Sequence, residues 1–122
     1  MPWNEGVKTL TAGEDLEAKR RVKIEAGTIQ TPPEVIHAGV GEAFIGVTEY
    51  AVKDGQPVAV RLKSASGTFE IECVIDTAIA PGTALYGAAD GKVSDAVSGS
   101  VQGIALQVAS ADNEHIEVAL DA

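Results

Sequence analysis

Hydrophobic and polar positions alternate over short stretches of this chain. In 58–63 and 68–75 every second residue is apolar, and most of the residues between are charged or polar. A period of two is typical of β-strands with one buried face. Thirteen glycines and five prolines interrupt the chain, which leaves room for short strands and little helix. The pattern predicts an all-β protein, a small barrel or sandwich of short antiparallel strands.

Turn dipeptides separate the predicted strands. Asp54-Gly55 joins a strand near 45–52 to the strand 58–63, and Asp90-Gly91 lies between two short apolar stretches. Asp-Gly in this setting favours a hairpin because both residues tolerate positive φ. Ser66-Gly67 predicts a further hairpin, in which apolar residues face apolar ones and charges face their opposites. Its predicted pairs are Lys63 with Glu70, Arg61 with Glu72, Leu62 with Ile71, Val60 with Cys73 and Val58 with Ile75.

The end of the chain predicts one more hairpin, around the loop 111–113. Asn113 is expected to adopt a left-handed conformation there. The predicted pairs are Val108 with Ile116, Leu106 with Val118 and Ile104 with Leu120. The expected core has two matching faces, one formed by Val58, Val60, Leu62, Ile71, Cys73 and Ile75, and the other by Ile104, Leu106, Ile116, Val118 and Leu120.

The strand and turn motifs occur twice along the chain, in the same order. The strand endings "VAVRL" (58–62) and "IEVAL" (116–120) align directly, and Gly46 aligns with Gly103. An internal duplication is one explanation, and a chance match of two β-meanders is the other.

The N-terminal part follows a different pattern. Residues 1–11 are polar and lack periodicity, so we expect an extended N-terminal arm, followed by a single β-domain over 12–122. Trp3 in this arm either folds back onto the domain or anchors the arm on another chain, since tryptophan is enriched at binding hot spots. In the stretch "RRVKIE", Val22 and Ile24 are expected to point inward from a half-buried strand.

Composition narrows the function classes. The formal net charge is −9, and an acidic chain repels phosphate backbones, so we expect no nucleic-acid partner. A lone cysteine, Cys73, excludes an intramolecular disulfide. No apolar run is long enough to span a membrane, and the first residues do not form a signal peptide, so no membrane partner is expected.

No group of residues predicts catalysis, a metal or a cofactor. Cys73 is expected in the core, as a small hydrophobic residue. His37, placed in a surface loop, and His115, placed after a turn, lack partners at metal-ligand spacing. The carboxylates of Glu70 and Glu72 have basic neighbours in the predicted hairpin rather than a cleft. We therefore expect a protein that is not an enzyme.

The C-terminal half resembles the small capsid cement, or decoration, proteins of tailed bacteriophages. In that family a Pro-Gly-x-x-Leu-Tyr turn leads into a "DGKV" hairpin and a "GIAL" strand, as in 81–106 here. The first half fits more loosely, through "LTAGEDL", "VKIEAGTI" and "FIGVTEYAVKDGQPVAVRL". The matching motifs are structural, so the resemblance transfers no functional residue.

The resemblance implies a structural virion protein, made in the bacterial host cytoplasm, that binds the capsid exterior and bridges coat subunits. Its expected partners are the major capsid protein and further copies of itself, with a homotrimer expected first and a dimer second. From the residues we expect the arm and a proline-rich loop to make the contacts, through Pro2, Trp3, Asn4, Val7, Pro32 and Pro33. The alternatives are another virion component, such as a tail or baseplate subunit, and a small β binding module.

Overall fold

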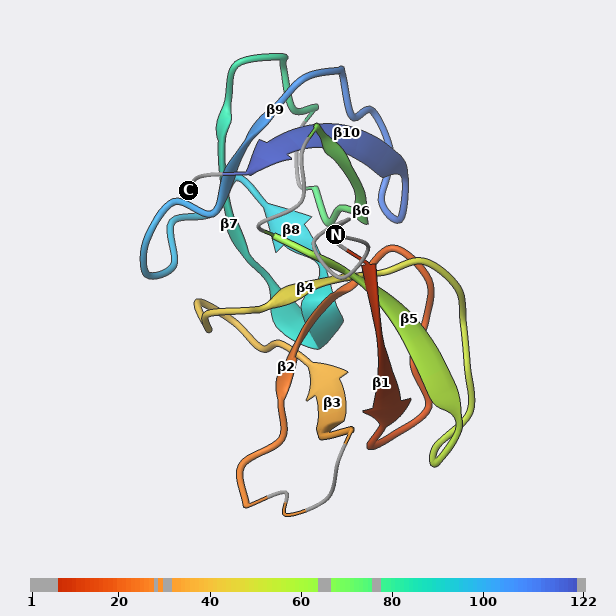
Figure 1. Cartoon of the computed structure of the whole chain (residues 1–122). Helices are drawn as coiled ribbons and strands as arrows, with labels where there is room; N and C mark the ends of the chain where they lie inside the picture. Colours follow the sequence, from red (N-terminus) through yellow and green to blue (C-terminus); the bar gives the residue numbers. More distant parts are fainter. Residues whose placement is uncertain (1–6, 28, 30–31, 64–66, 76–77, 121–122) are drawn as a thin grey trace.

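The fold is built almost entirely from short strands. A computed structural model describes residues 7–27, 29, 32–63, 67–75 and 78–120. They form ten strands and one 3-10 turn, η2 (Ala89–Gly91), arranged as two β-structures that follow one another along the chain (Figure 1). The predicted all-β class is confirmed.

The first half is a closed barrel with the strand order β1-β3-β2-β4-β5. All neighbouring strands are antiparallel except β1 and β3, which pair in parallel through two residue pairs. The strands are β1 (Val7–Ala12), β2 (Arg21–Ile24), β3 (Glu34–His37), β4 (Gly46–Thr48) and β5 (Pro57–Leu62).

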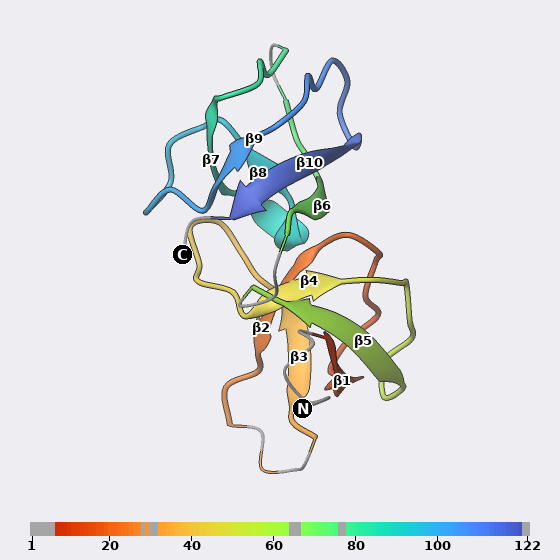
Figure 2. The ribbon, with the colours of Figure 1, turned by 45° about the horizontal axis from the view of Figure 1, so that its top comes forward.

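The second half is a five-stranded sheet with the order β6-β10-β9-β7-β8. A single parallel bridge, Cys73 to Val93, connects its two outer strands, and Figure 2 shows this sheet stacked on the barrel. The strands are β6 (Phe69–Glu72), β7 (Ala84–Gly87), β8 (Val93–Ser94), β9 (Gly103–Ala105) and β10 (His115–Leu120).

The two halves share one topology. Each strand of the first half corresponds to the strand five places later, and all five pairings recur with the same direction. Even the isolated bridge Leu16 to Val52 has a counterpart, Ile79 to Ala109. Such agreement in pairing is difficult to reconcile with two unrelated meanders, and it supports the duplication that the repeated signals suggest.

Tight contacts are repeated as well. A Cβ atom on Gly46 would lie 2.4 Å from the carbonyl oxygen of Arg61, and one on Gly103 would lie 2.5 Å from Cγ1 of Val118. Glycine is therefore required at the same place in β4 and β9, where the neighbouring strand approaches closely. The predicted alignment of these two glycines corresponds to the same position in three dimensions.

The turn before the last strand of each half also recurs. The Gly55 N–H donates to the Ala12 carbonyl at 2.8 Å, and the Asn113 N–H donates to the Cys73 carbonyl at 2.8 Å. Both turn residues are left-handed, with φ of 85° at Gly55 and 66° at Asn113. The expected conformation of Asn113 is confirmed.

Two clusters of buried side chains form the core. The smaller cluster fills the barrel and includes Val58 and Val60 from β5. The larger cluster lies under the second sheet and extends to the junction, where Phe44 and Val47 of the first half join it. The first expected face is therefore divided. Val58, Val60 and Leu62 belong to the smaller cluster, whereas Ile71, Cys73 and Ile75 share the larger cluster with Ile116, Val118 and Leu120 of the second expected face.

The predicted hairpin around Ser66-Gly67 is wrong. Strand β5 pairs with β1 on one edge and with β4 on the other, while β6 pairs with β10. A strand has only two edges, and closing the barrel uses both edges of β5. Although β5 and β6 are consecutive in the chain, they belong to different halves of the molecule, and each strand pairs with other neighbours. Ser66 of the predicted turn lies outside the described residues.

The predicted register of β9 and β10 is wrong by one residue. Ile104 lies opposite Ala119, and Val118 lies opposite Ala105. A slip of one residue exchanges the faces, so Ile104 and Leu106 are exposed while Ala105 is buried. The physical reason is the close approach of β10, which leaves no room for a side chain at Gly103 on the inner face of β9. Ala105 shares this face, and Ile104 points outward.

Two features of the N-terminal part also differ from expectation. Val7–Ala12 forms β1, one of the strands of the barrel. The last five residues of the arm expected over 1–11 therefore belong to the domain. The rest of that arm, 1–6, lies outside the described residues. In β2, Val22 is buried as expected, but Ile24 is exposed and Arg21 is fully buried.

Candidate functional site

Arg21 holds the two halves together from inside the junction. The five N–H groups of its guanidinium reach six acceptor oxygens at 2.7 to 3.3 Å, with Nη2 shared among three of them, and half of the acceptors belong to the second half of the chain. Burial lowers the pKa of Arg21 to about 10, opposed by the charge of Glu42. The acceptors are the carbonyl oxygens of Ala38, Gly39, Glu42, Ala88 and Lys92 and the side-chain oxygen of Gln102.

A second contact between the halves is the ion pair of Arg20 with Glu72. Two hydrogen bonds of 3.1 and 3.2 Å join them, and both side chains are only 11% exposed. Lys92 and His115 also lie within 3.6 Å of the Glu72 carboxylate. Burial alone would raise the pKa of Glu72, but hydrogen bonding and charge from Arg20, with help from Lys92 and His115, lower it.

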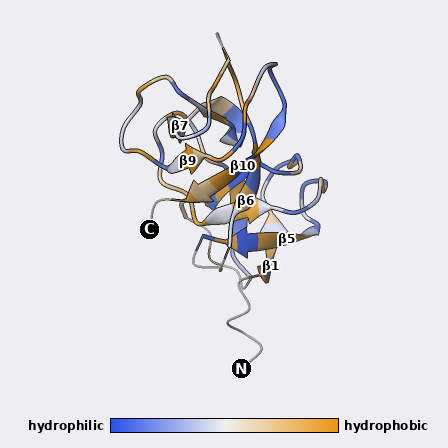
Figure 3. Ribbon diagram, turned by 90° about the horizontal axis from the view of Figure 1, so that it is seen from above, coloured by the Kyte–Doolittle hydropathy of each residue, from blue (hydrophilic) through white to orange (hydrophobic). Residues whose placement is uncertain are grey.

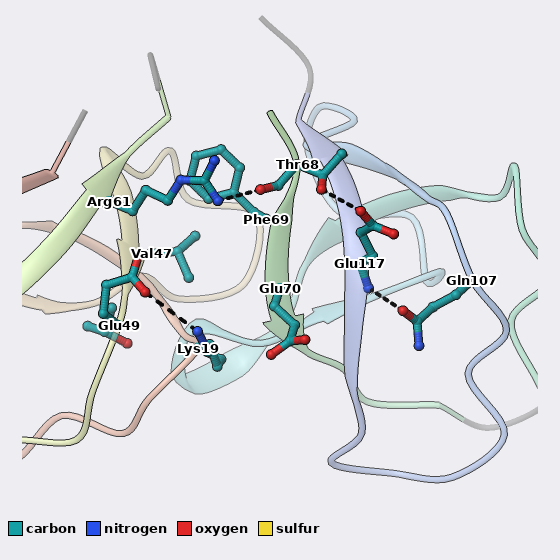
Figure 4. Close-up of a pocket in the computed structure, with 10 residues that line it drawn as sticks. Lys19, Val47, Glu49, Arg61, Thr68, Phe69, Glu70, Gln107 and Glu117 are labelled. Atoms are coloured by element: carbon teal, nitrogen blue, oxygen red, sulfur yellow. Dashed lines mark hydrogen bonds and ion pairs between the residues drawn. The ribbon is translucent and has the colours of Figure 1, made fainter. Parts of the chain in front are cut away.

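A polar groove of about 300 Å³ lies between the halves (Figure 4). The Arg61 guanidinium donates a hydrogen bond to the Thr68 carbonyl oxygen, and its carbon Cζ lies 4.3 Å from the centre of the Phe69 ring. Glu70 faces Glu117 directly across β6 and β10. This groove can accept polar or basic groups. Its lining residues are Lys19, Val47, Thr48, Glu49, Arg61, Thr68, Phe69, Glu70, Gln107 and Glu117.

The residues predicted to contact a partner do not form one cluster. Pro2, Trp3 and Asn4 lie outside the described residues. Val7 is exposed at the start of β1, where it pairs with Arg61.

The two prolines lie beside the far end of the same strand. The Thr11 N–H donates to the Pro33 carbonyl at 3.1 Å, and the Thr11 hydroxyl donates to the Pro32 carbonyl at 3.3 Å. Thr11 lies four residue steps along the strand from Val7, which corresponds to about 13 Å. The prolines and Val7 therefore belong to one barrel but to opposite ends of it.

Two loops that are distant in sequence meet beside the junction. A Cβ on Gly41 would lie 2.9 Å from the Ser98 hydroxyl, and Gly99 packs against Gly41. These loops expose Val40 and Val97, which are 62% and 80% accessible. Sequence reasoning missed Val97, because nothing in the local pattern shows that the two loops are neighbours.

Part of the outer face of the second sheet, around β9, is apolar and exposed to solvent. Ile104 and Leu106 are 37% and 42% exposed, and Ala84 and Ala119 lie directly beside Ile104 on the neighbouring strands. Figure 3 shows hydrophobic colouring along β9 and at the end of β10. The sequence placed Ile104 and Leu106 in the core, so it missed this surface.

The titratable groups elsewhere are in structural roles. Cys73 is buried, as predicted, and burial raises the pKa of its thiol, whereas a reactive cysteine needs a lowered pKa. His37 ends β3 instead of lying in a loop. Its Nε2 accepts from the Glu17 N–H at 3.2 Å, and burial lowers its pKa against the opposing charge of Glu14.

Among the described residues, no three histidine, cysteine or acidic side chains are grouped so that they could hold a metal ion. The described part of the chain also has no helix long and apolar enough to cross a membrane.

Comparisons with known proteins point in one direction. Residues 3–120 match the model of a family described as phage cement protein. No curated protein matches the chain in sequence. The fold is similar to that of the head fiber gp8.5 N base in bacteriophage phi29, with a TM-score of 0.76 and 18% identity over 94% of this chain and 92% of that one.

Proposed function

We propose that this chain, which belongs to the phage cement protein family, binds the outer surface of an assembled capsid and stabilises the shell by bridging neighbouring coat subunits. Family membership makes it a capsid-associated structural protein of the virion. The observation that carries the proposal is the family match over 3–120, nearly the whole chain. A surface protein that acts as a bridge needs a stable body and at least two separate contact regions.

The surface of the described part provides such regions. Val40 and Val97 project from neighbouring loops at one place, and Pro32 lies beside the far end of β1. We assign the coat contact to the segment ahead of β1, with Pro2, Trp3 and Asn4, together with Val7 and the loop that carries Pro32 and Pro33. The major capsid protein is the partner, and the described residues contribute no catalytic group to this role.

Further copies of the chain are the second partner. A homotrimer is our first expectation and a dimer our second, because a protein that binds at a symmetry axis of the shell gains contacts when its own symmetry matches. Nucleic acid is not a partner, because the net charge of −9 opposes it. The same charge favours a basic coat surface, so attachment should weaken as salt rises.

The test adds the purified protein to particles that lack it, followed by electron microscopy. Density on the capsid exterior, between coat subunits, is the expected result. Density on the tail or baseplate would instead identify another virion component, and failure to bind either would contradict the proposal.

The contact segment is tested by deleting residues 2–6, a deletion that leaves β1 intact. Binding should weaken strongly, because the deletion removes Trp3 and its apolar surface of about 150–250 Å². The substitution Tyr50→Ser, at an exposed site outside the proposed contact regions, serves as the matched control. Equal binding by the truncated and full chains would move the contact from this segment to the loops.

A further inference from the structure

Equivalent rows of outward-facing residues cross the two halves of the molecule. In the barrel, Arg21, Val47 and Arg61 lie side by side on β2, β4 and β5. They point away from the barrel interior, because Val60, which lies next to Arg61 in sequence, is inside. In the second sheet the row consists of Ala84, Ile104 and Ala119 on β7, β9 and β10.

The row of the first half is covered by the second half. Val47 is only 3% exposed and belongs to the large core cluster of the second sheet. Arg21 donates to the carbonyl oxygens of Ala88 and Lys92, and Arg61 stacks on Phe69. This face of the repeated fold therefore already serves as an interface with another domain of the same fold.

The row of the second half has no such cover within the described residues. Ile104, the counterpart of Val47, is 37% exposed, and Leu106 continues the apolar surface along the chain. No charged side chain belongs to this row, although the chain as a whole carries a net charge of −9.

We propose that the outer face of β7, β9 and β10, centred on Ile104 and Leu106, is a self-association surface covered by a second copy of this chain. The partner has the same fold because the equivalent face of the barrel is covered by a domain of that fold. The exposed Glu117 of β10 lies beside Leu106, whose N–H donates to the Glu117 carbonyl at 2.9 Å, and it bounds the apolar patch on that side. The inference deepens the proposed function by locating the contact between copies, but its evidence does not depend on capsid binding.

The test is sedimentation velocity over a range of concentrations, on the full chain and three variants. The unchanged protein should form oligomers as its concentration rises. Ile104→Asp places a charge at the centre of the face and should weaken association at least about ten-fold. Val97→Asp introduces the same charge at a more exposed site of the same half and should associate like the unchanged protein.

Ile104→Thr keeps the β-branched shape and the strand preference, so it covers the case in which the aspartate variant fails to fold. It should weaken association by a smaller factor, with an unchanged circular dichroism spectrum. A monomer at every concentration, or variants at Ile104 that associate as well as the unchanged chain, would overturn the inference.

Particle binding, measured in parallel, separates this inference from the proposed function. If Ile104→Asp lost binding to capsids but kept its self-association, the face would contact coat protein, which would overturn the inference and support the function. If the unchanged chain bound no particle, the function would fail, and sedimentation alone would still decide whether this face joins two copies.

Discussion

At the scale of single residues, the least expected feature is a fully buried arginine, Arg21, whose hydrogen-bond acceptors among the described residues include no carboxylate. Arg21 lies in a strand whose alternation placed it toward solvent, yet its guanidinium is surrounded by backbone carbonyl oxygens from both halves. Its planar fork of five N–H donors suits several acceptors that approach from different directions. At the junction, the two halves are therefore joined by the hydrogen bonds of this side chain, where packing of apolar side chains would be expected.

Replacement of Arg21 should be costly. Arg21→Met removes every donor and leaves buried carbonyl oxygens without partners, so we expect a loss of at least about 3 kcal/mol in the free energy of unfolding. Arg21→Lys should recover only part of this loss, because an ammonium offers three donors instead of a planar fork. Urea denaturation measures both values, and a loss below about 0.5 kcal/mol for the methionine variant, the usual size of a surface effect, would show that the carbonyls find other partners.

Glu72 should make stability depend on pH. Burial alone would raise the pKa of its carboxyl, but Arg20, with Lys92 and His115, holds that pKa below its ordinary value. A lowered folded-state pKa contributes stability above the unfolded value, and that stability is lost as pH falls through the folded value. At pH 7, Glu72→Gln should therefore lower the free energy of unfolding by about 1–3 kcal/mol. The variant should unfold at a lower temperature than the unchanged protein.

The difference between the two proteins should shrink once the pH falls below the ordinary range of a glutamate. Glu70→Gln, two residues away on the exposed face of the same strand, is the matched control. Thermal melts at pH 7 and pH 3 provide the comparison. A gap between Glu72→Gln and the unchanged chain that stays constant would mean that the ion pair contributes nothing to acid sensitivity.

At the scale of elements, the repeated glycines of β4 and β9 set how closely the neighbouring strands can approach. Gly46→Ala would place a methyl group 2.4 Å from the Arg61 carbonyl oxygen, an atom of the backbone that cannot move away alone. We expect a loss of about 1–3 kcal/mol, the usual range for overpacking. Gly103→Ala should cost a similar amount.

Gly39→Ala is the control for these glycines. Its Cβ would meet only the flexible Glu42 side chain, at 2.8 Å. Chemical denaturation of the three variants should therefore show a much smaller change for Gly39→Ala. Equal losses at Gly39 and Gly46 would indicate that glycine itself, and not the close approach, determines the cost.

The elements also show where sequence reasoning ends. Alternation and turn dipeptides located β2, β5, β6 and β10, and the Asp90-Gly91 turn appears between β7 and β8. Pairing depends on which strand edges are free, and no local pattern contains that information, so the hairpin of β5 with β6 was wrong. The large apolar residues of β9 also misled the prediction, because the close approach of β10 turns Ala105 inward in their place.

Whole-molecule packing was the least predictable part. The junction depends on Arg21, Val47 and Arg61, which lie on the outer face of the barrel. In the sequence, Arg21 and Arg61 alternate with apolar residues and are therefore expected to face solvent. Only the second half makes this face an interior, and its position could not be inferred without the pairing. The family resemblance and the internal repeat could be recognised because they depend on the order of motifs along the chain, not on their contacts in space.

Because the larger core cluster includes Phe44 and Val47 of the barrel, the two halves should unfold together. We expect a single transition in calorimetry, with equal calorimetric and van't Hoff enthalpies, as for other small domains. Two separate transitions would show that the junction contributes little to cooperativity. Arg21→Met, which weakens the junction from inside, is the variant in which such a separation should appear first.

The five consecutive residue pairs between β1 and β5 have a mechanical consequence. If the segment ahead of β1 is the attachment to a shell, a pull along β1 stretches all of its cross-strand hydrogen bonds at once, since these bonds run perpendicular to the strand. The same force applied across the strand would open them one after another. A tether that enters the molecule through β1 would thus resist tension in shear, and single-molecule pulling from the N-terminus should record a higher rupture force along the strand than across it.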